Sequence, residues 1–273
     1  GLAILSLLST SFVTVGSDQV AQLSRIYFGS QLPPGRIIAL DGEKGPQADI
    51  LGPGFHFSLL LNVLYRVEKV DVVEIKAGKY GKLVARDGKS LRPGQAFADT
   101  FGPIDEMLDA TTFLRNGGQK GPQIFVLTPG LWRINQYLWE VTQDDATDIP
   151  KGFVGVVKSN VHAAVNFGDM NVAKPEMCNP TVETDLSGGK LSVPLVPVGC
   201  IGIWDKSLLP AHFYLNKDVY TVIQMDTRVQ TWEFKGGFKR RSVALTVDQQ
   251  GKISQKETET DEEFKPEYVK NQK

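Results

Sequence analysis

A turn that recurs along the chain, Leu-x-Pro-Gly between two apolar strands, constrains the fold more than any other feature of this sequence. It reads LGPGFHF from Leu51, LTPGLWR from Leu127 and, with Ala in place of Gly, LLPAHFY from Leu208. Pro fixes φ at such a turn, and Gly supplies backbone conformations that other residues resist. A turn repeated together with its flanking strands predicts tandem, small, β-rich modules.

The spacing of the Pro-Gly pairs suggests a period for this repeat. Gly54, Gly94 and Gly130 are separated by 40 and 36 residues, and Ala211 lies 81 residues further on, close to two such steps. A period near 40 residues lies in the range of repeat architectures. Stability alone would explain such a repeat, whereas a functional interpretation is that the modules stack into a wall or cage. The repeat turns are Pro53, Gly54, Pro93, Gly94, Pro129, Gly130, Pro210 and Ala211.

A second element recurs upstream of the strands. It reads PPGRIIAL, KAGKYGKLV, PKGFVGVV and PVGCIGIW, each with a Gly before an apolar run. Between these elements the chain alternates apolar and polar residues, which is typical of half-buried antiparallel strands. The segment PIDEMLDATTFLRNGG is the exception: its apolar residues at helical spacing predict a helix that ends at Gly117.

The first residues form an apolar run without charge. Leu2 to Val15 is shorter than the roughly 20 residues that cross a bilayer, so it fits a signal-peptide core, a buried helix or the end of a membrane helix that begins outside this chain. We expect the last, a truncated anchor over residues 1–16, followed by a juxtamembrane helix over 17–29 that Ser17 or Asp18 caps. The anchor residues are Leu2, Ile4, Leu5, Leu7, Leu8, Phe12, Val13 and Val15.

The charge balance and cysteine usage limit the partners. Lys and Arg number 30 against 31 Asp and Glu, for a net charge of −1 in 273 residues. This balance argues against nucleic acid, which favours a basic domain. The two cysteines, Cys178 and Cys200, lack a CxxC spacing, which makes a zinc ribbon or a thiol redox motif unlikely from sequence. Two free structural thiols are favoured over one disulfide, and both readings stay open.

The segment from Leu208 to Gly237 resembles the stomatin/prohibitin/flotillin superfamily domain, called SPFH or band 7. The resemblance rests on the strand Gly199–Ile203, the turn and His-Phe of Leu208–Phe213, and the Met-Asp-Thr-Arg and Gln-Thr-x-Glu segments between Met225 and Glu233. Ala211 departs from the family's Gly, and the family's second half, with its long coiled coil, does not follow. The resemblance implies a membrane-anchored, ring- or dome-forming scaffold that organises a membrane microdomain or encloses a client protein.

These observations together predict an α+β, mostly β fold. A membrane helix precedes tandem SPFH-like modules with one or two helices. The expected domains are a first module over 30–117, a second over 118–195 and the first part of an SPFH domain with a polar tail over 196–273.

Chemistry is hard to place on this chain. It has three histidines, and His56 and His212 both follow a repeat turn, so they fit structural positions better than a metal pair. His162 has no evident carboxylate or Cys partner in the sequence. No P-loop, G-x-S-x-G or H-E-x-x-H motif is present. We therefore expect no catalytic, cofactor or metal site, and an enzyme with a site around one histidine is the remotest alternative.

Candidate oligomer contacts follow the last repeat turn. Asp226 and Arg228 alternate on a predicted strand and share one face, where they could pair within a surface or between subunits. With them we group Gln230 and Trp232. The leading hypothesis is a non-enzymatic homo-oligomeric scaffold on a lipid bilayer, and the alternative is a regulator or adaptor of a membrane protease.

Overall fold

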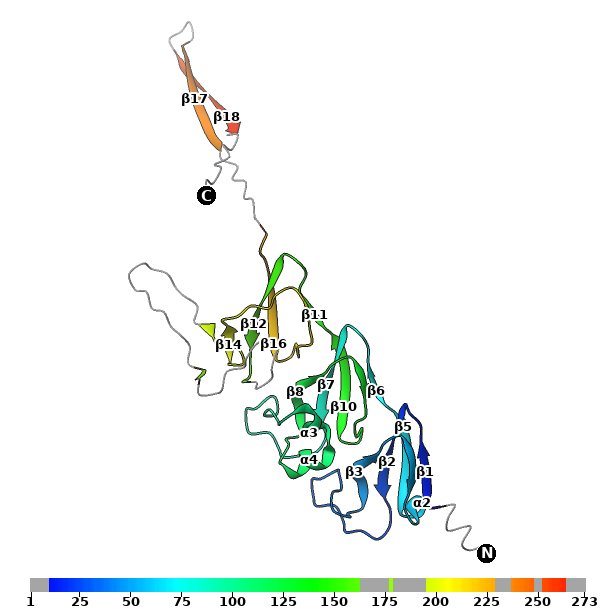
Figure 1. The fold of residues 1–273 in the computed structure, drawn as a ribbon. Coiled ribbons are helices and arrows are strands. Elements are labelled where there is room, and N and C mark those ends of the chain that lie inside the picture. Colours follow the sequence, from blue (N-terminus) through cyan, green and yellow to red (C-terminus); the bar gives the residue numbers. More distant parts are fainter. Residues whose placement is uncertain (1–9, 163–176, 179–194, 229–236, 248–251, 264–273) are drawn as a thin grey trace, which may run out of the picture. The chain divides into compact units, whose positions relative to one another are not determined.

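The computed structural model describes residues 10–162, 177–178, 195–228, 237–247 and 252–263. Strand accounts for 47% and helix for 8% of the structure. The chain divides into two compact units, Gly1–Thr227 and Arg228–Lys273 (Figure 1). The described residues are therefore mostly β and their helices are short, so the expected α+β fold with an N-terminal membrane helix is wrong.

The first unit contains three modules with the same order of strands. In modules 1 and 2 the core sheet has three antiparallel strands, with the module's second strand in the middle. Module 3 keeps this arrangement and adds a fourth strand, paired parallel, at one edge of the sheet. In all three modules a short two-stranded ribbon joins the first strand to the strand after the repeat turn. Module 1 consists of β1 (Phe12–Val15), β2 (Gln19–Arg25), β3 (Gly45–Leu51), β4 (Gly54–Phe57) and β5 (Tyr65–Asp71). Module 2 consists of β6 (Val73–Ile75), β7 (Lys79–Ala85), β8 (Gly121–Leu127), β9 (Gly130–Trp132) and β10 (Trp139–Asp145). Module 3 consists of β11 (Thr147–Asp148), β12 (Phe153–Ser159), β13 (Leu195–Val196), β14 (Gly202–Trp204), β15 (His212–Phe213) and β16 (Tyr220–Asp226).

Identical backbone hydrogen bonds show that the three modules are copies of one unit. The residue after the last strand of each module donates to the turn before its second strand: Val72 N to Asp18 O at 2.9 Å, Ala146 N to Gly78 O at 2.8 Å and Thr227 N to Gly152 O at 2.9 Å. A second set of backbone hydrogen bonds joins the end of the second strand to the start of the last strand: Ile26 N to Leu64 O, Arg86 N to Leu138 O and Asn160 N to Val219 O. The strand pairings therefore place the module limits elsewhere than at 30–117, 118–195 and 196–273.

The repeat is longer than the expected 40 residues. Gly54, Gly130 and Ala211 hold equivalent places, opposite Val15 and Ile75 in the ribbons and beside Ile149. Gly94 belongs to another position, because it shares its positive φ with Gly35 (81° and 84°) in the loop between the second and third strands. The equivalent turns are 76 and 81 residues apart. Two different turns that both contain Pro-Gly had produced the shorter spacing.

The second recurring element also combines two positions of the repeat. KAGKYGKLV and PKGFVGVV form the turn and second strand of modules 2 and 3. PPGRIIAL and PVGCIGIW are equivalent instead to LRPGQAF, because each contains the loop glycine with positive φ, namely Gly35, Gly199 and Gly94. Position within the module, rather than local sequence similarity, separates the two sets.

The expected membrane helix over residues 1–16 is wrong for the part that the structure describes. Phe12–Val15 is strand β1, paired with β4, and its burial alternates, with Val13 and Val15 inside and Phe12 exposed. β-branched Val and Thr favour such a strand. Leu2, Ile4, Leu5, Leu7 and Leu8 lie outside the described residues.

Among the described residues, no helix is both long and apolar enough to cross a membrane. The predicted single-pass anchor at the N-terminus, and the membrane localisation that rested on it, are therefore not supported.

The expected juxtamembrane helix over 17–29 is also wrong. Gln19–Arg25 is β2, the central strand of module 1, and Gly16 to Asp18 form the turn that leads into it. Val20, Leu23, Ile26 and Tyr27 fit a helical spacing, but both faces of β2 are buried, so the alternation that would have indicated a strand is absent.

Three short helices occur in the described residues. The segment expected as one helix after Pro103 forms two, α3 (Ile104–Leu108) and α4 (Ala110–Arg115), and Asp109 separates them because its side chain caps α4 by accepting from Thr112 N. They are an insertion in module 2, and Met107 and Phe113 pack in its core. The third helix is α2 (Leu61–Leu64) in module 1.

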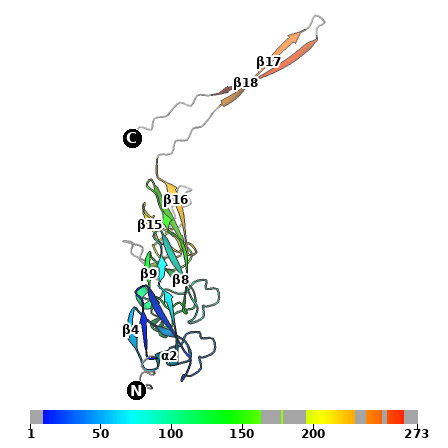
Figure 2. The same cartoon turned by 90° about the vertical axis from the view of Figure 1, so that its right-hand side faces the viewer.

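The second unit contains one hairpin in its described residues, β17 (Gly237–Val247) paired antiparallel with β18 (Ile253–Glu263) (Figure 2). Val243, Leu245 and Val247 alternate along β17, and all three side chains are exposed. A single two-stranded hairpin is at best marginally stable in water. Its apolar side chains therefore require another surface.

Candidate functional site

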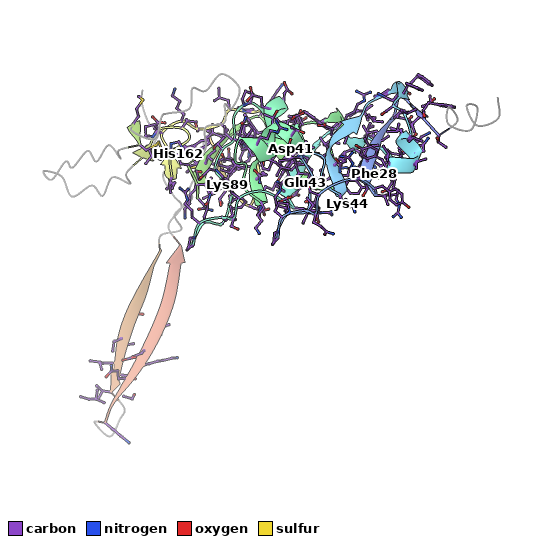
Figure 3. All side chains as sticks on the ribbon, turned by 90° about the horizontal axis from the view of Figure 1, so that it is seen from below. Phe28, Asp41, Glu43, Lys44, Lys89 and His162 are labelled. Atoms are coloured by element: carbon purple, nitrogen blue, oxygen red, sulfur yellow. A yellow bond between two sulfur atoms is a disulfide. The ribbon has the colours of Figure 1, made fainter. Side chains whose placement is uncertain are left out.

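A buried carboxylate holds module 2 against module 1. Asp87 follows β7, is 2% exposed, and accepts hydrogen bonds from Ile37 N and Ile38 N in the loop of module 1, both at 2.8 Å. Arg36 lies 3.9 Å from the same carboxylate oxygen. A buried charge requires such partners, because an unpaired one would cost several kcal/mol. The loops that follow β2, β7 and β12 include Phe28, Lys89 and His162, which are labelled in Figure 3.

Two equivalent asparagines join each module to the one before it. Asn135 Nδ2 donates to Gln47 O and Ala48 O of module 1, both at 2.8 Å, and Asn216 Nδ2 donates to Gln123 O of module 2 at 3.2 Å. Each Oδ1 meanwhile accepts a backbone N–H two residues along the chain, from Tyr137 N in module 2 and Asp218 N in module 3. Each asparagine side chain thus stabilises its own turn and also binds the preceding module.

The junction between modules 2 and 3 is less polar. Val161 occupies the position of Asp87 and packs, with Phe97 and Ile124 of module 2, against the core of module 3. At the edge of this junction Lys82 Nζ lies 3.1 Å from Asp218 Oδ2, a hydrogen bond that raises the pKa of Lys82. Two junctions of the same backbone design therefore use different chemistry.

At both junctions the next module covers the outer face of a core sheet, the face turned away from that sheet's own core. In module 1, Val20 and Gln22 on this face are 0% and 2% exposed. The residues of module 2 above them include Tyr137, whose hydroxyl donates to Glu68 at 2.8 Å, and Gln136, which donates to Asp71 O at 2.7 Å. The following module therefore removes this face from water.

Module 2 shows the same arrangement. Tyr80, the equivalent of Val20, is 0% exposed, and its hydroxyl accepts from Lys217 N of module 3 at 3.0 Å. Burial raises the pKa of the Tyr80 hydroxyl. The turn that begins at Asn216 thus covers module 2 as the turn at Asn135 covers module 1.

The outer face of module 3 has no such cover among the described residues. Its members are two cross-strand pairs, Val154 with Met225 and Val156 with Ile223. Ile223 is 57% and Met225 55% exposed, and the two valines are partly exposed. The same positions in module 2 hold Lys82, Thr142, Asp144 and the buried Tyr80. We call Val154, Val156, Ile223 and Met225 the outer face of module 3.

Module 1 lies at the other end of the repeat. It exposes apolar residues at the positions that module 2 uses to contact module 1. Phe57 is equivalent to Arg133, which donates to Ser17 O of module 1 at 3.1 Å. The turn that follows in module 1 is two residues longer and includes Leu59 and Val63. Phe57, Leu59 and Val63 are 59%, 62% and 41% exposed; we call them the leading surface of module 1.

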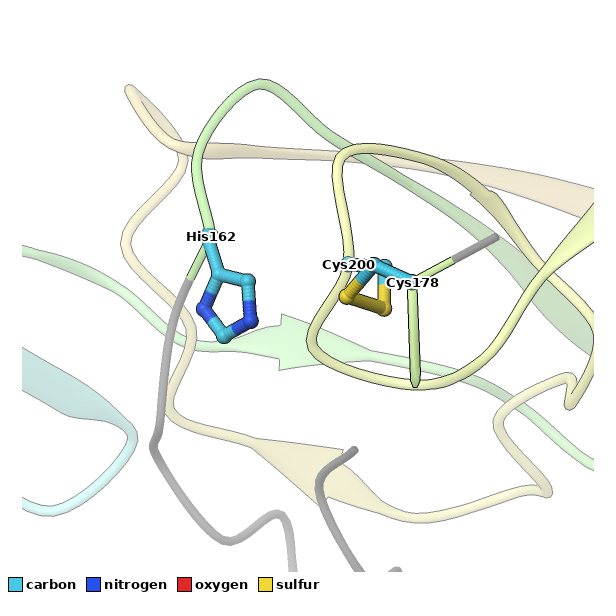
Figure 4. A group of neighbouring side chains, drawn as sticks. All are labelled: His162, Cys178 and Cys200. Carbon is cyan, nitrogen blue, oxygen red and sulfur yellow. A yellow bond between two sulfur atoms is a disulfide. The ribbon is translucent and has the colours of Figure 1, made fainter. Parts of the chain in front are cut away.

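A second cluster lies in module 3, where a disulfide joins Cys178 to Cys200 with their Cα atoms 5.4 Å apart. Cys200 is fully buried in the core of module 3. His162, in the loop after β12, lies beside the disulfide (Figure 4), and the ligand atoms of all three residues lie within 4.8 Å of one another. Imidazole nitrogen and cysteine sulfur are metal-ligand atoms, and here the disulfide engages both sulfurs.

Sequence reasoning missed this cluster for two reasons. It favoured two free thiols, whereas the structure bonds them, and it found no partner for His162. The three residues belong to a loop, an insertion and a second loop, so no spacing in the sequence signals their meeting.

The other two histidines are structural or exposed, and they are not equivalent to each other. His56 Nε2 donates to Gly52 O at 2.7 Å, as Trp132 Nε1 donates to Thr128 O in module 2. His212 lies one position earlier in its ribbon, is exposed, and pairs with Asp148 at 3.2 Å. The expected match of the two histidines is therefore off by one residue.

A pocket of about 450 Å³ lies between modules 1 and 2 and is lined by Asp49, Asp105, Asp109 and Arg133, among others. Two of its acidic residues have structural partners: Asp49 accepts from Thr111 Oγ1 at 2.7 Å, and Asp109 caps α4. These two carboxylates are therefore already engaged in structural hydrogen bonds.

The candidate oligomer contacts are divided between described and other residues. Asp226 ends β16 and is partly buried, and Arg228 is exposed. Gln230 and Trp232 lie outside the described residues. Their role between subunits stays a prediction.

No family model, curated protein or solved structure matches this chain. The resemblance to the SPFH or band 7 domain therefore gains no support from the comparisons, and the described residues do not support the membrane features that it implied. The repeated modules and their junctions remain as the basis for a function.

Proposed function

We propose that this protein is an architectural subunit that assembles with copies of itself head to tail. In this arrangement the leading surface of module 1 in one copy covers the outer face of module 3 in the next. The observation that carries the proposal is the exposed outer face of module 3, at positions that the next module covers in modules 1 and 2.

The chemistry of the two surfaces supports a second copy as the occupant. The internal junctions include polar pairs between a covered face and the turn above it, Lys82 with Asp218 and Glu68 with Tyr137. The outer face of module 3 is apolar, and so is the leading surface of module 1. Contiguous exposed apolar residues of this kind usually mark an interaction site.

Symmetry gives the consequence of such a contact. A surface that binds a different surface on the next copy is heterologous, and it produces a ring if the rotation closes or a filament if it does not. The homo-oligomeric scaffold expected from the sequence is compatible with either. Enclosure of a client and regulation of a protease stay predictions, because no described contact involves a client.

The mass of the full chain in solution tests the proposal. Light scattering across a range of concentrations is expected to show species larger than one chain. Replacing both Ile223 and Met225 by Asp places two charges in the contact, so this variant is expected to be a monomer with an unchanged circular dichroism spectrum.

The matched control is the double variant Leu131→Asp with Leu209→Asp. Both residues are exposed at repeat turns, at 59% and 68%, and lie outside the two surfaces. This variant should assemble like the wild-type chain. A monomeric wild-type chain at all concentrations, or assembly that the Ile223 and Met225 replacements leave intact, would overturn the proposal.

A further inference from the structure

The geometry points to a Zn²⁺ site formed by His162, Cys178 and Cys200, which we propose is closed when the two cysteines form their disulfide and opened when they are reduced. This inference does not depend on the proposed assembly. It rests on the placement of the three side chains and on the surroundings of the histidine.

The three ligand atoms are close enough for one ion. They lie within 4.8 Å of one another. In a tetrahedral zinc site with Zn–S of about 2.3 Å and Zn–N of about 2.0–2.1 Å, neighbouring ligand atoms are roughly 3.5–3.8 Å apart. A shift of at most about 1 Å therefore brings the histidine nitrogen to the required distance, and breaking the disulfide lets the two sulfurs move apart to theirs.

The surroundings of His162 leave it available as a ligand. Its Nε2 atom is buried, and no hydrogen-bond partner for it is present in the described part of the chain. A buried nitrogen without a hydrogen-bond partner destabilises the folded chain, and a bound metal ion would remove that cost. His56 contacts Gly52 O and His212 contacts Asp148, so His162 differs from the other two histidines in this respect.

Reduction supplies the remaining two ligands. Two molecules of a small thiol reduce the disulfide: the S–S bond breaks, each protein sulfur takes one proton and one electron, and the two small thiols leave joined as their own disulfide. Zn²⁺ then displaces the two thiol protons and forms two Zn–S bonds, and His162 donates a nitrogen lone pair. Thiolate and imidazole ligands favour Zn²⁺ over Mg²⁺ or Ca²⁺, and three protein ligands leave the fourth position to water.

Cobalt titration of the full chain tests the site, since Co²⁺ replaces Zn²⁺ and reports its ligands by absorption. After reduction with a phosphine and removal of the reductant, the chain should bind one Co²⁺ with thiolate charge-transfer and tetrahedral ligand-field bands. The oxidised chain should show neither band. Added Zn²⁺ should displace the cobalt, because zinc prefers tetrahedral sulfur and nitrogen ligands.

Two variants separate the site from adventitious binding. His162→Ala keeps both cysteines. It should weaken Co²⁺ binding by at least about 10- to 100-fold, which is the loss of affinity when a supporting residue of a known metal site is removed. His212→Ala removes an exposed histidine and should leave the affinity unchanged. A folded, reduced chain that binds no Co²⁺, or one whose affinity His162→Ala leaves unchanged, would overturn the inference.

Discussion

The two internal junctions have the same backbone framework and differ in what fills it. The first is held by the buried carboxylate of Asp87, which accepts from two backbone N–H groups of module 1, and by two hydrogen bonds from Asn135. The second has Val161 at the position of Asp87 and one hydrogen bond from Asn216.

The comparison shows that the module geometry, rather than one set of side chains, determines how neighbours meet. The same turn reaches back to the same strand in both cases, while the side chains range from charged to apolar. An exposed apolar face at the end of module 3 is therefore within the range that the repeat already uses for its junctions. The predictions below test this comparison, beginning with the largest expected effect.

Removing the Asp87 carboxylate should destabilise the protein more than any of the changes that follow. Asp87→Ala leaves Ile37 N and Ile38 N without their acceptor and Arg36 without its partner. We expect a loss of about 3–5 kcal/mol in the free energy of unfolding, measured by urea denaturation, as for other broken buried charge pairs. The control is Asp99→Ala, which removes the exposed pair with Arg92 and should cost at most about 1 kcal/mol. Equal losses for the two variants would contradict this account of the first junction.

The second strand of modules 2 and 3 should not tolerate the side chain that module 1 carries. Ala21 is buried in module 1, where modules 2 and 3 have Gly81 and Gly155. A Cβ at Gly155 would lie 2.5 Å from Ile149 Cδ1 and 2.9 Å from Val222 Cγ1. Gly155→Ala should therefore lower the free energy of unfolding, measured by thermal denaturation, by about 1–3 kcal/mol through overpacking. An increase in stability would show that the core of module 3 has room that the structure does not indicate.

Replacing the two asparagines should lower stability in proportion to the number of hydrogen bonds that each makes to the preceding module. Asn135→Ala leaves the carbonyls of Gln47 and Ala48 without this donor, whereas Asn216→Ala affects the one at Gln123. We expect losses of about 2 and about 1 kcal/mol, respectively, in the free energy of unfolding. The reverse order would mean that the second junction depends on its asparagine more than the first does.

The smallest expected effect is at high pH. Burial, and then the hydrogen bond to Glu68, raise the pKa of Tyr137 to about 12. Because the folded pKa lies above the unfolded value of about 10, the stability from this group is complete below pH 10 and is lost as pH rises from about 10 to about 12. Tyr137→Phe should show a shallower loss of stability over this window than the wild-type chain. Identical pH profiles would show that this hydroxyl ionises equally easily in both states.

Much of the fold follows from sequence, and the failures have physical causes. The turns before β4, β9 and β15 were found because Pro and Gly carry specific backbone restrictions. β2 was taken for a helix because its two faces are both buried, so it shows no alternation. Gly94 was assigned to the wrong position because modules 1 and 2 each have two different turns that use a Gly with positive φ.

The site was less accessible to sequence reasoning. The outer face of a module is buried only by the next module, so residues such as Val20 and Ile223 cannot be told apart by local pattern. The cluster of His162, Cys178 and Cys200 forms across a long insertion, which gives no fixed spacing. Both sites depend on contacts between segments far apart in the chain.

The most direct test of the head-to-tail contact is a mixing experiment with two variants. One carries Ile223→Asp and Met225→Asp on the outer face of module 3, and the other carries Phe57→Asp and Val63→Asp on the leading surface of module 1. Each variant alone lacks one half of the contact and is expected to be a monomer. Mixed in equal amounts, they retain one intact surface each, and mass photometry should show dimers and nothing larger. Assembly of either variant alone, or a mixture that stays monomeric while the wild-type chain assembles, would contradict a contact between these two surfaces.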